Sequence, residues 1–187
     1  MRKLIVFAAF AAFAAPHSTD PLVLSAQHKL DVIQSGKAKP GAVFVFTLAE
    51  LNAWGRSEVK DLFPEGVRNA RLELGKGTAS VTILVDFLKI RHGKKLQTGW
   101  LLSKLLEGER PLRVNARIES AHGRATVYLT LVSISGLPIS GSTLDFIVET
   151  FFRPLFPDAR INKPFDLHDN VDHIEVTPAD ARAVIKR

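Results

Sequence analysis

Two histidines and two aspartates gather in one short stretch, residues 168–173, near the end of the chain. Imidazole nitrogens and carboxylate oxygens are common metal ligands. Their spacing here matches no zinc-binding motif, and in an extended strand Asp172 and His173 point to opposite faces. We therefore interpret the stretch as a polar turn between strands, and predict neither a metal site nor a cofactor.

Two other segments have the residue types of a catalytic or phosphate-binding loop without the required spacing. Residues 75–78 read Gly-Lys-Gly-Thr, but they join two predicted strands and lack the G-x-x-x-x-G-K-[ST] pattern. Residues 140–142, Ser-Gly-Ser, do not fit G-x-S-x-G. The chain also has no cysteine nucleophile. We predict that the protein is not an enzyme, since a hydrolase would need Asp and His side chains together in one pocket.

A basic loop follows one of the long predicted strands. Arg91, His92, Lys94 and Lys95 flank Gly93. Such side chains attract anionic lipid head groups, each by about 1 kcal/mol near a membrane surface. We predict that Arg91, Lys94 and Lys95 contact a head group, and that the protein touches anionic membrane surfaces peripherally. The alternative is an ordinary solvated turn.

A phenylalanine-rich segment carries the strongest apolar helical pattern in the chain. Between residues 142 and 155, large apolar side chains recur with the i, i+3, i+4, i+7 spacing of a helix. Pockets for apolar ligands are lined by hydrophobic and aromatic side chains. The predicted ligand-binding residues are Trp100, Leu101, Phe146, Ile147, Phe151 and Phe152. The alternative is that this stripe is plain core packing.

The first residues have the features of a secretory signal peptide. Arg2 and Lys3 precede a short apolar run that ends in Ala12-Phe13-Ala14, an A-x-A cleavage site. We predict a signal peptide over residues 1–14, a single domain over residues 15–187, and a periplasmic or secreted location. The run is shorter than the ~20 apolar residues of a membrane span, although an uncleaved anchor is the alternative.

The charge and cysteine content limit the class of protein. The chain has 25 Lys and Arg against 19 Asp and Glu, a formal net charge of +6. Loss of the first 14 residues removes two of these basic side chains and no acidic one. The remaining excess is too small for the footprint of a nucleic-acid binder, and we predict no nucleic-acid partner. Without cysteine the chain forms no disulfide.

The elements that would position these residues form an α+β pattern. The spacing predicts a helix over residues 22–33, with Leu22 on its apolar face, and a short strand at 43–46. A capping box at Thr47 and Glu50 starts a second helix, which Gly55 breaks into two pieces. Alternating apolar residues then predict strands at 67–74, 79–90, 112–118 and 125–131. A helix that Ser142 caps and short strands near 165–167, 171–177 and 182–185 complete the chain.

The strands and helices are segregated, which favours an α+β layered domain. A strand over residues 79–90 is on the order of 40 Å long, and twisted strands of that length tend to wrap around whatever covers them. We therefore expect a long, strongly curved antiparallel sheet wrapped around the apolar helix of residues 144–155, with additional N-terminal helices.

The order of elements and turns resembles a known group of proteins. The helix start at residues 47–52, the Pro-Glu-Gly-Val entry to a strand at 64–67, the long hairpin, the Gly-Leu-Pro-Ile turn at 136–139 and the Pro-Phe-Asp-Leu strand at 164–167 follow one another. This order is similar to that of small bacterial envelope proteins related to the tubular lipid-binding (TULIP) superfamily. The resemblance implies a curved sheet around a helix, with lipid or another apolar ligand between them and no catalysis.

Two functional hypotheses follow. In the first, the exported domain holds an apolar ligand such as an acyl chain, worth about 0.8 kcal/mol per buried CH₂. In the second, it is a structural or partner-binding envelope module with a filled core. A hydrolase of envelope polymers is the weakest of the alternatives, because it needs clustered polar groups in a cleft.

Overall fold

The structure is a computed structural model that describes residues 19–62, 65–90, 104, 106–149 and 162–187. In chain order its elements are α1 (Pro21–Gln34), β1 (Val43–Thr47), α2 (Leu48–Leu62), β2 (Val67–Gly75), β3 (Thr78–Asp86), α3 (Phe87–Ile90), β4 (Glu109–Ala121), β5 (Arg124–Ile134), β6 (Leu137–Pro138), α5 (Gly141–Ile147), β7 (Phe165–Asp166), β8 (Val171–Val176) and β9 (Asp180–Ile185). In the described ranges, no helix is long and apolar enough to cross a bilayer.

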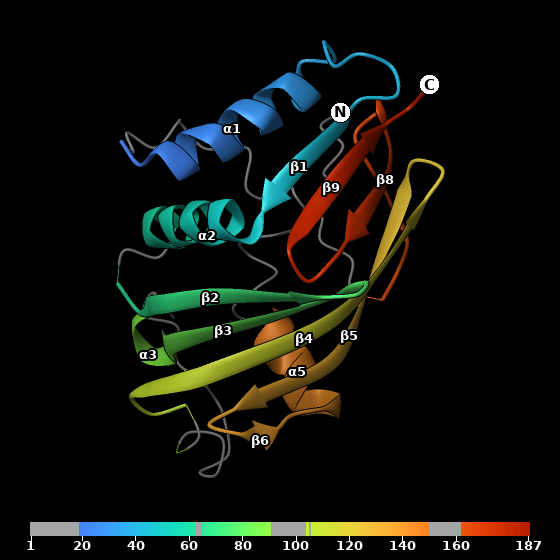
Figure 1. Cartoon of the computed structure of the whole chain (residues 1–187). Coiled ribbons are helices and arrows are strands. Elements are labelled where there is room, and N and C mark those ends of the chain that lie inside the picture. Colours follow the sequence, from blue (N-terminus) through green and yellow to red (C-terminus); the bar gives the residue numbers. More distant parts are fainter. Residues whose placement is uncertain (1–18, 63–64, 91–103, 105, 150–161) are drawn as a thin grey trace.

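The strands form two antiparallel sheets. One has the order β1-β9-β8, and the larger one has the order β2-β3-β4-β5-β6, with β7 also pairing with β5. Figure 1 shows α1 and α2 stacked beside the small sheet, with α2 also lying along β2. In the same view α5 lies behind the lower part of the large sheet.

The predicted strongly curved sheet around an apolar helix is wrong. The sheets are neither closed nor strongly curled. β3 ends at Asp86 rather than near residue 90, because the Asp86 carboxylate accepts a hydrogen bond from the Lys89 backbone N–H and starts α3. In the described part of α5, Leu144 packs at one end of the large sheet. The last strands pair with β1 in a sheet of their own, instead of extending the large one.

The first two helices follow the sequence closely. Asp20 caps α1 by accepting from the Leu22 N–H at 2.9 Å, and Gly36 ends it with a φ of 70°. The predicted capping box starts α2: Thr47 Oγ1 accepts from the Glu50 N–H, and Glu50 Oε2 accepts from the Thr47 N–H at 2.8 Å. Two details differ. α2 runs through Gly55 without a break, and Leu22 is exposed while Val23 lies in the core.

Side chains on these helices protect the open edges of both sheets. The Lys29 ammonium donates to the Val45 carbonyl of β1 at 2.8 Å. The Asn52 amide of α2 pairs with the backbone N–H and C=O of Leu72 in β2, at 2.8 and 2.9 Å. Unpaired edges invite pairing with other chains. These contacts therefore join the helices to the sheets. They also occupy backbone N–H and C=O groups of the edge strands that could otherwise pair with another chain.

The later elements are a mixture of confirmed and corrected predictions. The β4–β5 hairpin turns at His122 and Gly123, both with positive φ, as a tight hairpin turn requires. The three short terminal strands are present at the predicted places. The cap of α5 is Ser140 rather than Ser142, and its side chain makes no capping hydrogen bond.

The described core divides into two clusters. The first cluster joins α1, α2 and the small sheet, and its buried members are Val23, Ala26, Leu30, Ile33, Phe46, Leu51, Ala53, Trp54, Ala125, Leu167, Val171, Ala181, Ala183 and Ile185. The second cluster lies at the far end of the large sheet, and its buried members are Val85, Phe87, Leu106, Leu112, Val132, Ile134 and Ile139. Strands β3, β4 and β5 run between the two.

Candidate functional site

The predicted ligand-binding and head-group residues fall almost entirely outside the described residues. This holds for Trp100, Leu101, Phe151 and Phe152, and for the basic residues Arg91, Lys94 and Lys95. The backbone of Phe146 and Ile147 lies in α5. The predicted signal peptide, residues 1–14, is also outside the described part.

The cluster of His and Asp near the C-terminus takes a different form from the prediction. A register shift between Val171 and His173 marks a β-bulge in β8. The bulge breaks the alternation of faces, so the Asp172 carboxylate reaches the His173 Nδ1 at 2.6 Å instead of pointing away from it. Glu175 lies 3.5 Å from the other ring nitrogen. Across the described residues, no group of three or more His, Cys, Asp or Glu side chains is placed to hold a metal ion.

The most strongly perturbed carboxyl in the described chain is Glu50, which is 5% exposed. It accepts hydrogen bonds from Ser25 Oγ and Lys29 Nζ, both at 2.6 Å, as well as from Thr47. Burial raises the pKa of Glu50, but the hydrogen bonds from Lys29, Ser25 and Thr47 outweigh it and lower the pKa from 4.5 to about 2.

The geometry around Glu50 indicates a structural role. Both carboxylate oxygens are occupied, and the Lys29 ammonium also lies 5.6 Å from the centre of the Phe46 ring. An occupied, charged group inside a packed core holds its neighbours in place and has no free acceptor for a substrate proton. The sequence predicted the Thr47–Glu50 capping box, but gave no signal that Ser25 and Lys29 of α1 complete the network.

The best candidate for ligand binding is the apolar face of β3, β4 and β5 between the two clusters. Side chains alternate along these strands, and one face carries the predicted apolar series. Five of these residues are only partly buried and belong to neither cluster: Ala79, Val81, Ala116, Ile118 and Val127. We call these five residues the apolar stripe.

Cross-strand pairing makes the stripe continuous. Ala79 pairs with Ala116, and Ile118 pairs with Val127. At one end of the stripe Val114 and Leu129 pack against the second cluster. At the other end Ala125 belongs to the first cluster. The stripe is therefore an apolar surface with a closed core at each end.

The middle of the stripe consists of small side chains, which rise less far above the sheet than their neighbours. In the adjacent pair Ala79 and Ala116, Ala116 stands between the larger Val114 and Ile118 on β4, and Ala79 is followed by the larger Val81 on β3. Such a low place in an apolar face can accept part of an elongated apolar group. The alternation of the hairpin strands predicted this face from the sequence. The ligand-binding residues, however, were predicted in other segments of the chain. No protein-family model and no curated protein matches this chain.

Proposed function

We propose that the protein is exported and binds an acyl chain or a similar apolar ligand on the apolar stripe. The observation that carries this proposal is the partial burial of five adjacent apolar residues between two closed clusters. The same face of the sheet is fully packed at both ends, where Ala125 and Val132 are buried. Between these ends, the members of the stripe keep part of their apolar area accessible.

The energy of such binding comes from the removal of apolar surface from water. Each buried CH₂ group contributes about 0.8 kcal/mol, so a chain of ten such groups offers about 8 kcal/mol before the costs of association are subtracted. The stripe crosses three strands, with neighbouring strands about 4.8 Å apart. An extended chain fits this geometry better than a compact ligand.

The chemistry of the ligand's polar end follows from charge. The chain carries a net positive charge, which favours an anionic head group over a cationic one. The basic residues predicted to meet that head group, Arg91, Lys94 and Lys95, remain a prediction of the sequence. Export likewise rests on the signal-peptide pattern of residues 1–14, and a lipid ligand is consistent with work at a cell envelope.

A fluorescent fatty acid tests the binding site. We expect cis-parinaric acid to bind the purified protein with saturable enhancement of its fluorescence. Val127→Asn places an amide on the stripe without a hydrogen-bond partner from an acyl chain, and should weaken binding about tenfold. Thr126→Asn is the matched control, because it is the adjacent position on the opposite face of β5 and should leave the affinity unchanged.

Organic extraction tests the natural ligand and the export together. The protein is isolated from an expression host without added lipid, its intact mass is measured, and the extract is analysed by mass spectrometry. We expect a mass that corresponds to cleavage after Ala14 and a co-purifying lipid. If the protein takes up no fatty acid and yields no lipid, the apolar stripe is a packing surface and the structural or partner-binding alternative holds.

A further inference from the structure

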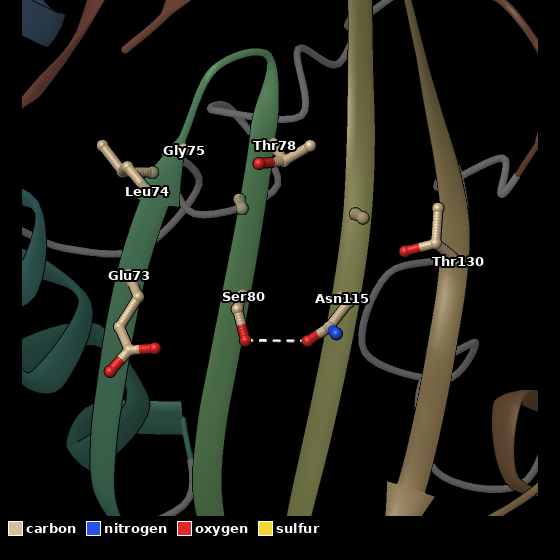
Figure 2. A pocket seen from close by; sticks show the side chains of 9 residues that line it. Glu73, Leu74, Gly75, Thr78, Ser80, Asn115 and Thr130 are labelled. Atoms are coloured by element: carbon tan, nitrogen blue, oxygen red, sulfur yellow. Dashed lines mark hydrogen bonds between the residues drawn. The ribbon is translucent and has the colours of Figure 1, made fainter. Parts of the chain in front are cut away.

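The opposite face of the large sheet carries a hollow of about 350 Å³. Figure 2 shows this hollow with the side chains that line it, among them Glu73, Ser80, Asn115 and Thr130. One polar side chain comes from each of four successive strands, β2 to β5. Glu73 pairs with Ser80 across the strands, and Ser80 pairs with Asn115. The four residues form a polar row perpendicular to the strand direction.

Two irregularities of the sequence produce this hollow. Gly75 lies on the same face as Glu73 and opposite Thr78, and a Cβ on Gly75 would stand 2.4 Å from Thr78 Oγ1. The missing side chain therefore lets the Thr78 hydroxyl lie close to the Gly75 backbone at the hollow, where the Cβ of any other residue type would collide with it. On β5, Thr130 is the extra residue of a bulge opposite Asn115 and Ala116. Thr130 and Leu131 are consecutive exposed residues, so the bulge turns the Thr130 hydroxyl toward the polar row.

Hydrogen bonds fix the row in one arrangement. Arg113 Nε donates to Ser80 Oγ at 3.3 Å, and Ser80 Oγ donates to Asn115 Oδ1 at 2.8 Å. This chain occupies the amide oxygen and leaves the amide N–H₂ of Asn115 as a donor. The Arg71 and Arg113 guanidinium groups lie 3.3 and 3.6 Å from the Glu73 carboxylate. Glu73 is half-exposed, so its oxygens keep capacity to accept further hydrogen bonds.

The neighbouring row keeps one side of the hollow open. Thr78 pairs with Arg117, and Arg117 pairs with Tyr128 on the next strand. The Arg117 guanidinium is directed to residues other than Thr78. It stacks on the Tyr128 ring, with 4.4 Å between them, and pairs with Glu119 along its own strand. No arginine or lysine is among the residues that line the hollow.

We propose that this hollow is a binding site for a neutral saccharide. Each sugar hydroxyl both donates and accepts a hydrogen bond. The row offers an acceptor at Glu73, a donor at Asn115 and hydroxyls at Ser80 and Thr130, spaced at the interval of adjacent strands, about 4.8 Å. A row that crosses four strands suits a chain of sugar residues that runs across the strands. The four polar side chains lie on the face opposite the apolar side chains of the stripe, although Ala79 and Ala116 also line the hollow. The inference does not depend on the proposed function.

Nuclear magnetic resonance of the isotope-labelled full chain tests the site. The probes are four neutral tetrasaccharides (cellotetraose, laminaritetraose, maltotetraose and N-acetylchitotetraose), with tetragalacturonate as the acidic counterpart and glycerol as a simple polyol. We expect at least one neutral tetrasaccharide to shift the backbone amides of Ser80, Asn115 and Thr130 saturably, with a dissociation constant of about 1 mM. Tetragalacturonate and glycerol should bind more weakly.

Two variants locate the binding. Thr130→Val removes one hydroxyl without a change of size and should weaken binding about threefold to tenfold, and Glu73→Gln should weaken it about tenfold. Thr126→Val is the matched control, since it is the same isosteric change on the same strand and face outside the lining. The proposal is overturned if no neutral tetrasaccharide gives a saturable shift up to about 10 mM, if the shifts centre elsewhere, if tetragalacturonate binds most tightly, or if Thr130→Val and Thr126→Val behave alike.

Discussion

The two hydrophobic clusters are closed in different ways. Within the described residues, the first cluster has fourteen buried members and lies between two helices and the small sheet. The second has seven, and it occupies only one end of the large sheet. The first is also tied together by charge, through the Lys29–Glu50 pair. The second rests on apolar contacts around Phe87, Leu112 and Ile134.

This difference indicates that different parts of the large sheet stabilise the fold and offer a surface for a ligand. Its hairpin end is anchored in the first cluster through Ala125, and its other end is anchored in the second. The apolar stripe between them does not have to supply most of the folding energy. A surface of that kind is free to gain energy from a ligand, because occupation of the stripe does not require the core to rearrange.

The largest expected effect is the loss of the charged network in the first cluster. Glu50→Ala removes the acceptor of Lys29 and Ser25 and destroys the cap of α2. Removal of one partner of a buried pair costs about 3 to 5 kcal/mol. We expect urea denaturation to show a fall of that size in the free energy of unfolding. Glu119→Gln, at an exposed ion pair, is the control and should change it by less than about 0.5 kcal/mol.

The pH dependence checks the cause of this loss. The pKa of Glu50 lies at about 2 in the folded protein, below its ordinary value of 4.5. A depressed pKa contributes stability above pH 4.5, and that stability is lost as the pH falls from there through 2. The difference corresponds to about 3 kcal/mol. Glu50→Ala should lack this part of the acid dependence. An unchanged pH profile would show that the network does not stabilise the first cluster.

A matched pair of valines sharpens the comparison between core and stripe. Val132 and Val127 lie on the same strand and the same apolar face, but Val132 is buried in the second cluster and Val127 is a half-buried member of the stripe. We expect Val132→Ala to lower the free energy of unfolding by about 2 kcal/mol. Val127→Ala should lower it by less than about 1 kcal/mol in the absence of ligand. Equal losses would mean that the stripe is part of a closed core.

The parts of the fold with local signals were predictable from the sequence. The Thr47–Glu50 capping box, the glycine stop at Gly36 and the His122-Gly123 turn each act within a few residues, and each is present. The alternation along β3, β4 and β5 likewise predicted the apolar face as far as Leu129, but it wrongly continued that face to Leu131, which the bulge at Thr130 turns to the other side. Such signals depend on backbone geometry that neighbouring residues decide.

The arrangement of the sheets was not predictable in this way. The division into two sheets depends on which strands pair at long range, such as β1 with β9, and nothing local distinguishes that pairing from a continuous sheet. The bulges at Asp172 and Thr130 also carry no sequence signal, yet they decide which side chains meet. Alternation placed Asp172 and His173 on opposite faces, and one extra residue in the strand reversed that result.

The smallest expected effect lies on the small sheet, at the His173 bulge. The hydrogen bond that His173 donates to the Asp172 carboxylate raises the pKa of His173, partial burial opposes this, and Glu175 adds to the increase. A raised pKa contributes stability below 6.5, and that stability is lost as the pH rises through the folded value. Nuclear magnetic resonance titration should therefore give His173 a pKa above that of a free histidine, and Asp172→Asn should lower it. Because this pair lies partly in solvent, its weakening should leave the first cluster intact. A fall in overall stability comparable with that of Glu50→Ala would show that the bulge, rather than the buried network, holds the small sheet to the rest of the molecule.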